Sequence, residues 1–362
     1  MTADLASLDP WAAMLMGASL GPYVLVEHLN AGHFGHVFEA EHSHTRARFA
    51  LKVLKLNPSA ATSTEFVNEA VLLRQLSGCD GIIKFVDEGV GRVELQVNGG
   101  IVMPVDVQYL VLSRASGSVD ELILDPIARG ELSGLEKLRL WRDVVKAVRQ
   151  MHGLGIAHRD LKCSNCLLMV SGNYSSVKLA DLGRSKDLAH PPARMAEEYL
   201  FGRGDMRFAP PEFLYLLGDS SSSSAISSDY YGIGSILVEL FTGQSLTSIV
   251  MGDLNRVIEQ AKADYLAGRS RDPRILVGRY RSVIADVVEL MPLSIRTDAS
   301  TLLNQMCHPD PTMRSLPSPY RRDRLDRDQL HWILKRVDIM IKQLEIEMRT
   351  ERRSNQMERR SA

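Results

Sequence analysis

HRDLKCSN occupies residues 158–165, and DLG begins sixteen residues after Asn165. The polar side chains of these two motifs each suit one part of a phosphoryl transfer. Asp160 can accept the proton of an attacking hydroxyl group. Asn165 and Asp181 present the oxygen ligands that Mg²⁺ prefers. Lys162 stands two residues after Asp160, where its cation can lie against a phosphate group. These side chains are therefore candidates for a site that binds a divalent metal ion and a phosphate group.

A second motif, NAGHFGHV at residues 30–37, joins two expected strands, 23–28 and 35–40. Small residues in such a hairpin let backbone N–H groups approach phosphates. A third expected strand, 49–54, carries Lys52, whose ammonium group can hold the α- and β-phosphates of a nucleotide. The order of loop, strand and lysine predicts a nucleotide site in this part of the chain.

These motifs resemble the catalytic loop, magnesium motif, glycine-rich loop and third-strand lysine of eukaryotic-type (Hanks-type) Ser/Thr protein kinases. Residues 208–212, FAPPE, resemble the APE box of that family, with proline in place of alanine. Asp229 resembles the aspartate that braces the catalytic loop, and Arg314 resembles the arginine that pairs with Glu212. The resemblance covers about Tyr23 to Pro317. Small-molecule phosphotransferases of similar core fold lack this activation segment. The APE-like box and Arg314 therefore argue against the third hypothesis, a kinase-fold enzyme that acts on a small molecule or uses another nucleotide-transfer chemistry.

The resemblance implies a role for each site residue. It implies that the catalytic residues are Asp160, Lys162, Lys52 and Glu69, and that Asn165 and Asp181 hold Mg²⁺, with Mn²⁺ as an alternative. The implied ATP-binding residues are Asn30, Gly32, Phe34, Gly35, Val37, Ala50, Lys52, Leu112, Ser113, Ala115, Asp120 and Leu168. In that set Leu112 is the gatekeeper, and the backbone of Ser113 and Ala115 binds adenine.

Two of these assignments have alternatives, and a third residue departs from the family pattern. The sequence NEAVLL at residues 68–73 favours Glu69 as the partner of Lys52, and Glu65, one helical turn earlier, is the runner-up. Asp120 either reaches the ribose or caps the helix that starts at Glu121. Asn30 replaces the first glycine of the loop, and we explain it by the tolerance of asparagine for left-handed backbone.

The implied fold is α+β: a bilobal protein-kinase fold with a small β-rich N-lobe, a larger helical C-lobe and a C-terminal helical extension. The expected boundaries are an N-terminal extension at 1–22, the N-lobe at 23–112, the hinge at 113–118, the C-lobe at 119–320, and a helix with tail at 321–362. Local patterns predict helices at 64–76, 135–154 and 231–241 and strands at 82–87, 108–112, 166–169 and 177–179. Ser63 or Thr64 is the expected cap of the first helix. The serine run at 220–224 predicts a flexible loop.

A final helix is expected to start near Asp326, after Pro317 and Pro319. Its apolar residues follow heptad spacing: Leu330, Leu334, Val337, Ile341, Leu344 and Met348. We favour a helix packed on its own catalytic lobe, and a dimer or partner-helix seam through 326–348 is the alternative. Residues 349–362 mix Arg and Glu and predict a frayed tail.

One position of the activation segment departs from the family pattern. Asp205 stands where these kinases carry a threonine that bridges the catalytic aspartate and lysine; it cannot donate such a proton, but it can pair with Lys162. Between residues 183 and 204 only Ser185 and Tyr199 carry hydroxyl groups. We hypothesise that a carboxylate, from Glu197 or Glu198, and not a phosphate orders this segment against Arg159.

Composition excludes several other classes of protein. The formal net charge of −1 is too small to attract nucleic acid or an anionic membrane through a long-range electrostatic field. The chain lacks an apolar run of about 18 residues and a recognisable signal peptide, so we expect no membrane span and a cytoplasmic location. Four cysteines are too few for a disulfide scaffold, and the Cys163–Cys166 pair lacks the second ligand pair of a zinc site. Histidines 33, 36, 42 and 44 crowd the first hairpin, and we favour solvated imidazoles over a metal site.

The leading hypothesis is an ATP- and Mg²⁺-dependent kinase that phosphorylates Ser or Thr residues of protein substrates. Lys162 favours Ser/Thr over Tyr by family resemblance, and Asp205 weakens that inference. The alternative is a pseudokinase, a nucleotide-binding scaffold that recruits a partner through its C-terminal helix. Decayed kinases usually lose one of the four key residues, and Lys52, Asp160, Asn165 and Asp181 are all present.

Overall fold

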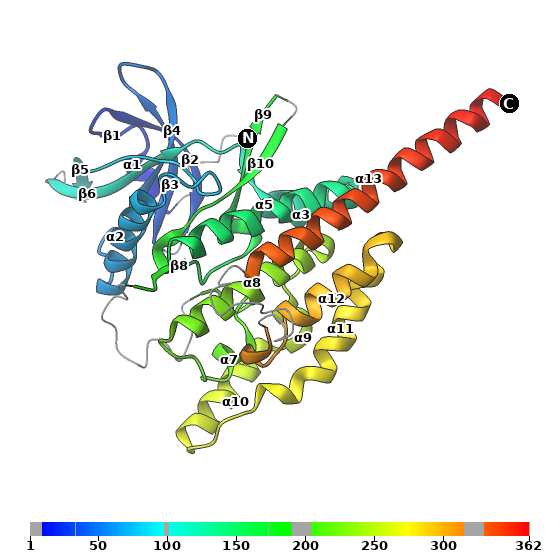
Figure 1. Cartoon of the computed structure of the whole chain (residues 1–362). Coiled ribbons are helices and arrows are strands. Elements are labelled where there is room, and N and C mark those ends of the chain that lie inside the picture. The colour runs from blue at the N-terminus through cyan, green and yellow to red at the C-terminus, as the bar shows by residue number, and fades with distance from the viewer. Residues whose placement is uncertain are drawn as a thin grey trace. The chain divides into compact units, whose positions relative to one another are not determined.

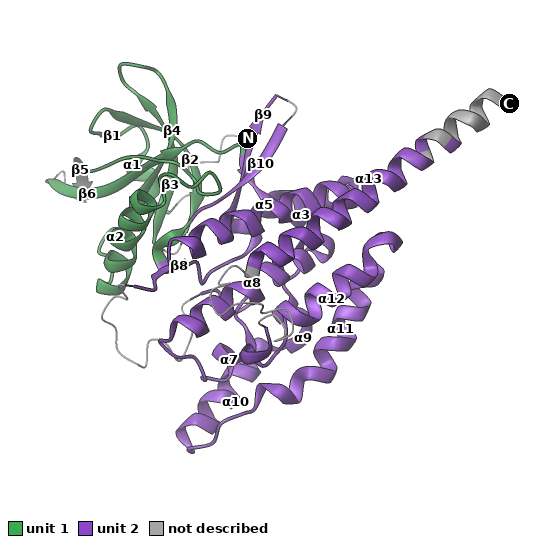
Figure 2. Ribbon diagram, in the orientation of Figure 1, with its two compact units in different colours: residues 1–116, 181–183 green, residues 117–180, 184–362 purple. Residues whose placement is uncertain are grey.

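The computed structural model describes residues 9–32, 34–97, 101–172, 174–189, 204–314 and 329–361. The chain divides into two compact units (Figure 2). Unit 1 comprises residues 1–116 and 181–183, and unit 2 comprises residues 117–180 and 184–362. Most of the strands belong to unit 1 and most of the helices to unit 2 (Figure 1). The expected α+β class is therefore confirmed.

Unit 1 is built on a six-stranded antiparallel sheet with strand order β1-β2-β3-β4-β6-β5. Its strands are β1 (Ser19–Leu20), β2 (Tyr23–Ala31), β3 (Gly35–His42), β4 (Arg48–Leu54), β5 (Phe85–Val97) and β6 (Ile101–Ser113). The strand predictions at 82–87 and 108–112 were too short, because β5 and β6 have 13 residues each and pair along nearly their whole length.

Helix α1 (Pro10–Leu15) contributes to the core of this sheet. Asp9 caps its first turn, and the side chains of Trp11 and Leu15 are buried with Leu25 and Phe38 of the sheet. The Trp11 indole also donates a hydrogen bond to the Leu54 carbonyl at 3.3 Å. Residues before Tyr23 are thus part of the folded unit and not only an appendage to it.

Helix α2 (Ala60–Gln75) carries a buried face that includes Phe66, Glu69 and Leu73. Ser59 is its N-cap, because the Ser59 hydroxyl accepts a hydrogen bond from the Thr62 N–H at 3.1 Å. The prediction of a cap at Ser63 or Thr64 was wrong, since the helix begins a full turn earlier than the apolar spacing indicated.

Unit 2 is mainly helical. Its longer helices are α5 (Gly134–Gly153), α8 (Ser222–Thr242), α10 (Leu254–Leu266), α11 (Val277–Glu289), α12 (Arg296–Met306) and α13 (Gln329–Ser361); the short helices are α3 (Val119–Leu124), α4 (Pro126–Glu131), α7 (Pro211–Leu214) and α9 (Leu246–Met251). A capping box between Ser133 and Glu136 starts α5. The serine run does not form a flexible loop: Ser221 caps α8, and the following serines make its first turn.

Two small sheets hold the catalytic motifs of unit 2. Strand β9 (Cys166–Ser171) pairs with β10 (Tyr174–Leu179) and β7 (Gly117–Ser118), and β8 (Ile156–Ala157) pairs with β11 (Lys186–Asp187). Residues 158–165 therefore run between two paired strands, and this fixes both ends of the loop that carries Asp160.

The C-terminal helix α13 lies against α5 (Figure 1). Four residues of the predicted seam are buried, namely Leu330, Leu334, Val337 and Leu344. Ion pairs Arg139–Glu345 and Arg142–Asp338, at 3.1 and 2.6 Å, flank this contact. The expected frayed tail is wrong, because the helix continues to Ser361. The expected helix start at Asp326, and Pro317 and Pro319, lie outside the described residues.

Among the described residues, no helix is both long enough and apolar enough to span a bilayer.

Candidate active site

Lys52 lies at the centre of an ion cluster in unit 1. Its Nζ donates hydrogen bonds to Glu69 Oε2 at 2.6 Å and to Asp181 Oδ1 at 2.7 Å. Lys52 belongs to β4, Glu69 to the buried face of α2, and Asp181 follows β10 with a φ of 61°, in the left-handed region. The structure thus pairs Lys52 with Glu69 and not with the runner-up, Glu65.

The ion pairs of this cluster do not occupy all of its carboxylate oxygens. Burial acts to lower the pKa of Lys52, but Asp181 and Glu69 outweigh it and hold this pKa above its usual value. Burial raises the pKa of Glu69 against the opposing effect of Lys52, and Glu69 Oε1 is buried with no hydrogen-bond partner among the described residues. The Asp181 side chain is 29% exposed. A partly exposed carboxylate beside a buried lysine fits a Mg²⁺-nucleotide.

The glycine-rich loop forms a tight turn. The Gly32 N–H donates to the Gly35 carbonyl at 2.8 Å, across residue 33, which lies outside the described residues. A side chain at Gly35 would collide with the Val53 carbonyl, because an added Cβ would be 2.0 Å from that oxygen. Glycine is therefore required there by the close approach of β3 and β4.

The explanation for Asn30 was wrong. Asn30 lies in β2 and does not have a positive φ. Its Oδ1 instead accepts the Ala31 N–H at 2.8 Å, so the side chain supports the turn by a local hydrogen bond. Phe34 is buried, and the Lys52 ammonium lies 5.3 Å from the centroid of its ring. Val37 is half-buried in β3.

The predicted hinge continues β6. Leu112 is 7% exposed and pairs with Ala50 of β4. The Ser113 N–H donates to the Lys84 carbonyl at 2.9 Å, so this N–H is already used within unit 1. The Ala115 carbonyl accepts a hydrogen bond from the Arg114 guanidinium.

Asp120 and Leu168 lie in unit 2. Ser118 is the N-cap of α3, so the reading of Asp120 as a cap is wrong. Asp120 Oδ1 is buried with no hydrogen-bond partner among the described residues. Leu168 pairs with Gly117 across β9 and β7 and is 7% exposed.

Asp160 of unit 2 is buried, and hydrogen-bond donors of three side chains lie close to it. Lys162 Nζ and Arg184 Nη1 lie 3.5 and 3.3 Å from Asp160 Oδ2. Asn165 donates its Nδ2 to the Asp160 carbonyl at 2.7 Å and to Oδ2 at 3.4 Å. These bonds use the amide nitrogen of Asn165 and not its oxygen, the atom type that binds Mg²⁺.

The loop is held by Asp229 of α8. Asp229 accepts the backbone N–H of His158 at 2.8 Å, the N–H of Arg159 at 2.7 Å, and a hydrogen bond from His152 Nε2 at 2.8 Å. Burial acts to raise the pKa of Asp229, but His152 and the other donors hold it below its usual value. Asp229 is thus an ionised brace, and sequence reasoning missed its partner His152.

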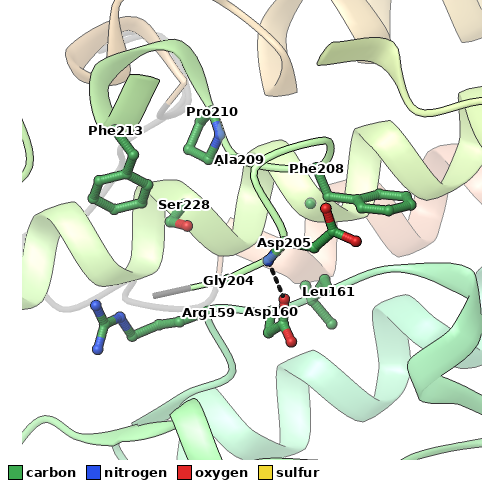
Figure 3. A pocket seen from close by; sticks show the side chains of 11 residues that line it. Arg159, Asp160, Leu161, Gly204, Asp205, Phe208, Ala209, Pro210, Phe213 and Ser228 are labelled. Atoms are coloured by element: carbon green, nitrogen blue, oxygen red, sulfur yellow. Dashed lines mark hydrogen bonds between the residues drawn. The ribbon is translucent and has the colours of Figure 1, made fainter. Parts of the chain in front are cut away.

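Asp205 does not pair with Lys162 as expected. Its carboxylate is bound by the Arg207 guanidinium through Nε at 3.0 and 3.1 Å and through Nη2 at 2.6 Å. The Asp205 N–H donates to Asp160 Oδ1 at 3.4 Å (Figure 3). A small cavity of about 20 Å³ adjoins this segment, lined in part by Leu161, Phe208 and Phe213. It has room for about one water molecule.

A buried carboxyl group adjoins the two cysteines of the catalytic loop. Glu239 of α8 accepts the Cys163 N–H at 3.1 Å, and burial raises the pKa of Glu239 to about 7. Burial also raises the thiol pKa values of Cys163 and Cys166 well above their usual range. A fully buried, protonated thiol is a poor nucleophile.

Glu212 and Arg314 form a buried bidentate pair. Both carboxylate oxygens accept from the guanidinium at 2.7 Å, and Arg314 also donates to the carbonyls of His308 and Ser227. This contact joins α7 to the segment after α12, so it stabilises unit 2 and touches no reacting group.

The segment between Gly183 and Gly204 is partly outside the described residues, which include neither Tyr199 nor Glu197 and Glu198. Ser185 is described: it is 2% exposed, and its hydroxyl donates to the His158 carbonyl at 3.2 Å. A buried, hydrogen-bonded hydroxyl is a poor phosphorylation site, so Ser185 is a structural residue.

The histidines of the first hairpin are not all solvated, as we had expected. His36 is 2% exposed, and its Nδ1 lies 3.3 Å from His28 Nε2. Burial lowers the pKa of both imidazoles. Among the described residues, no three His, Cys, Asp or Glu side chains group as a metal site.

Comparison with known proteins identifies the family. The protein kinase domain matches residues 23–319. The chain belongs to the protein kinase family. Its relatives include CBL-interacting protein kinase 21 from Oryza sativa subsp. japonica, 27% identical over 278 residues, which are 76% of this chain and 47% of that protein.

Two other relatives in the family are also distant. The probable serine/threonine-protein kinase PknB of Lactococcus lactis is 28% identical over 61% of this chain and 32% of its own length. The inhibitor of nuclear factor kappa-B kinase subunit alpha of Gallus gallus is 25% identical over 62% of this chain and 27% of its own. The chain therefore spans about half or less of the length of these kinases.

Proposed function

We propose that this kinase transfers the γ-phosphate of ATP to Ser or Thr hydroxyl groups of protein substrates. The observation that carries the proposal is Asp160, a buried carboxylate that lies beside Lys162. Asp229 holds the loop that carries both residues, because it accepts the backbone N–H groups of His158 and Arg159. The name of one relative, the probable serine/threonine-protein kinase PknB, supports the same class of substrate.

In the proposed reaction Asp160 accepts the proton of the substrate hydroxyl as the oxygen attacks the γ-phosphorus. A bond forms between that oxygen and phosphorus, the bond from phosphorus to the β-phosphate oxygen breaks, and ADP leaves. Lys162 neutralises charge on the transferred group. Lys52, held by Glu69, positions the α- and β-phosphates. Mg²⁺ bound through Asn165 and Asp181 would supply further charge neutralisation.

The direct test is transfer of label from γ-labelled ATP to a generic protein acceptor, followed by identification of the phosphorylated residue. Asp160→Asn keeps the size of the side chain and removes the base, so kcat should fall by about 10²–10⁴-fold, while ATP affinity changes little. Asp272→Asn, an exposed aspartate elsewhere in unit 2, is the matched control and should retain activity.

Label found only on tyrosine would contradict the Ser/Thr assignment. A wild-type chain that binds ATP but transfers no phosphate would favour the alternative, a pseudokinase that recruits a partner through residues 326–348 as a dimer or partner-helix seam.

A further inference from the structure

Residue 205 places a second carboxyl group beside the catalytic base. The Asp205 N–H donates to Asp160 Oδ1, and the chain passes so close at Gly204 that an added Cβ would lie 2.8 Å from the same oxygen (Figure 3). The threonine that the family carries there is neutral. An aspartate adds a negative charge at a point where the backbone touches the Asp160 carboxylate.

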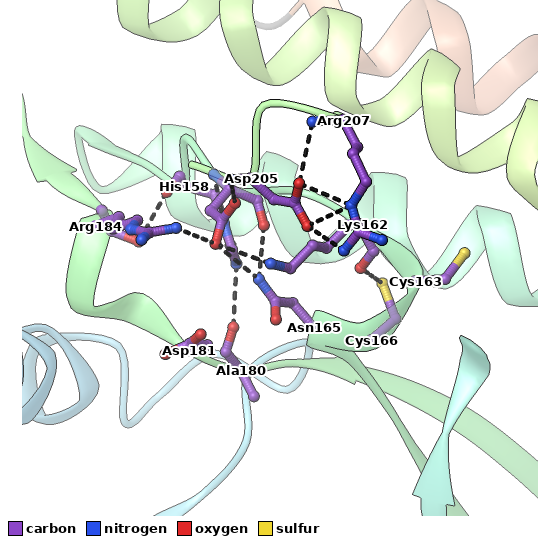
Figure 4. Close-up of polar contacts among 12 residues, drawn as sticks. His158, Lys162, Cys163, Asn165, Cys166, Ala180, Asp181, Arg184, Asp205 and Arg207 are labelled. Atoms are coloured by element: carbon purple, nitrogen blue, oxygen red, sulfur yellow. Dashed lines mark hydrogen bonds and ion pairs between the residues drawn. The ribbon is translucent and has the colours of Figure 1, made fainter. Parts of the chain in front are cut away.

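Arg207 neutralises this additional charge. Its backbone N–H donates to Asp205 Oδ1 at 3.0 Å, and its guanidinium reaches both carboxylate oxygens (Figure 4). Burial acts to raise the pKa of Asp205, but the hydrogen bonds from Arg207 hold it below its usual value. Asp205 is therefore a carboxylate whose charge is matched within its own segment.

Lys162 is the cation for which the two carboxylates could compete. Its positive charge also lowers the pKa of Asp205, more weakly than Arg207 does. Among the described residues, however, its ion pair is with Asp160 Oδ2 at 3.5 Å. A lysine side chain is flexible, and removal of Arg207 would leave Asp205 as an uncompensated carboxylate within its reach.

We propose that Arg207 is a positioning residue: by saturating Asp205, it leaves Lys162 with Asp160 and the transferred phosphate. The inference rests on the proposed function and explains how this chain tolerates aspartate at a position that the family pattern gives to threonine. Arg207 acts through Asp205 and Lys162 and touches no reacting group itself.

A purely structural role for the Arg207 side chain is a weaker explanation. The side chain is 70% exposed, so it contributes little packing. The backbone at Arg207 is held independently, because its carbonyl accepts hydrogen bonds from the Ser245 and Ser248 hydroxyls. Loss of the guanidinium should therefore leave the path of the segment intact.

The chain contains a matched control for this pair. Asp272 and Arg274 repeat the Asp-x-Arg spacing, with the backbone N–H of Arg274 on Asp272 Oδ1 at 2.9 Å and its Nε on both oxygens at 3.0 and 2.8 Å. The Arg274 side chain is 69% exposed, nearly the same as that of Arg207. This pair lies in unit 2 but does not contact Asp160 or Lys162.

The test compares steady-state kinetics of Arg207→Met, Arg207→Lys, Arg274→Met and the double variant Asp205→Thr/Arg207→Met. We expect Arg207→Met to lower kcat by about tenfold or more, with KM for ATP changed by less than about twofold. Arg207→Lys should be intermediate, and Arg274→Met should match wild type. The double variant should recover to within about threefold of wild type, because threonine needs no counter-ion.

A crystal structure of Arg207→Met gives a readout that is independent of activity. In it, Lys162 Nζ should form its ion pair with the Asp205 carboxylate and not with Asp160. Unchanged kcat in Arg207→Met, no recovery in the double variant, an equal loss in Arg274→Met, or Lys162 still on Asp160 would each overturn the inference. An inactive wild type would overturn the proposed function instead, while the displacement of Lys162 would still test the inference.

Discussion

In unit 2, Glu212 and Arg314 satisfy each other: two hydrogen bonds of 2.7 Å join them, and the remaining donors of Arg314 reach backbone carbonyls. In unit 1, Lys52 is shared by two carboxylates, and Glu69 Oε1 accepts no hydrogen bond from the described residues. Both clusters are buried, but only the second combines an unsatisfied oxygen with a carboxylate that is 29% exposed. A saturated cluster stabilises a fold, whereas an unsaturated one can take up a ligand.

The largest expected effect on stability is at the saturated pair. Arg314→Met leaves Glu212 buried without its cation, so the free energy of unfolding should fall by about 3–5 kcal/mol. Urea unfolding followed by tryptophan fluorescence would measure it. Glu212→Gln combined with Arg314→Met removes the stranded charge and should recover part of the loss; a double variant as unstable as the sum of the two single variants would contradict the comparison.

Glu239 extends the comparison to a buried carboxyl group with no ion pair among the described residues. Its pKa is raised to about 7 from 4.5, so its stabilising contribution is present below about pH 4.5 and is lost as the pH rises through 7. Across that window wild type should lose about 3 kcal/mol relative to Glu239→Gln. Urea unfolding of both proteins at a series of pH values would measure this difference. If the two stabilities instead changed in the same way with pH, the prediction would be wrong, because Glu239 would then be ionised already at acidic pH.

At the unsaturated cluster, removal of the cation should cost less stability. Lys52→Met leaves Glu69 able to protonate and Asp181 partly in water, so we expect the free energy of unfolding to fall by under about 2 kcal/mol. The effect on ligand binding should be larger. ATP with Mg²⁺ should raise the melting temperature of wild type and not of Lys52→Met. A loss of stability as large as that of Arg314→Met would erase the distinction between the clusters.

The smallest effect is expected at an exposed pair. Arg274→Met breaks an ion pair whose two side chains are 69% and 44% exposed, so the urea midpoint should not move. A measurable shift would mean that exposure is a poor guide to the contribution of an ion pair in this chain.

The sequence was sufficient to predict the ion clusters because their chemistry restricts the residue types. Only a lysine, carboxylates and an amide at fixed spacings suit the proposed reaction, and Lys52 does pair with Glu69 in the structure. Arg207 and Arg184 were missed, because a compensating arginine has no fixed position in a motif. The Asp-x-Arg spacing at 205–207, repeated at 272–274, was the signal available for the first of them.

Element ends were predicted less well than element types. Both helices start earlier than the apolar spacing shows, by about one turn after Ser59 and by more than two turns after Ser221, because their first residues are mostly small or polar and carry no apolar pattern. The tail after Met348 was mistaken for a frayed end, because a helix that is polar all round has no hydrophobic period.

Helix α13 determines where this kinase can be truncated and which segments a chimera must contain. The family match ends at residue 319, yet Leu330, Ile333, Val337 and other residues of α13 are buried in unit 2. A chain ended at the family boundary would expose the apolar surface that α13 covers on α5, and exposed patches of that kind promote aggregation. The part of this protein that can be moved as a folded unit is therefore longer than the matched kinase domain. A chimera that exchanges catalytic domains has to include both α5 and α13.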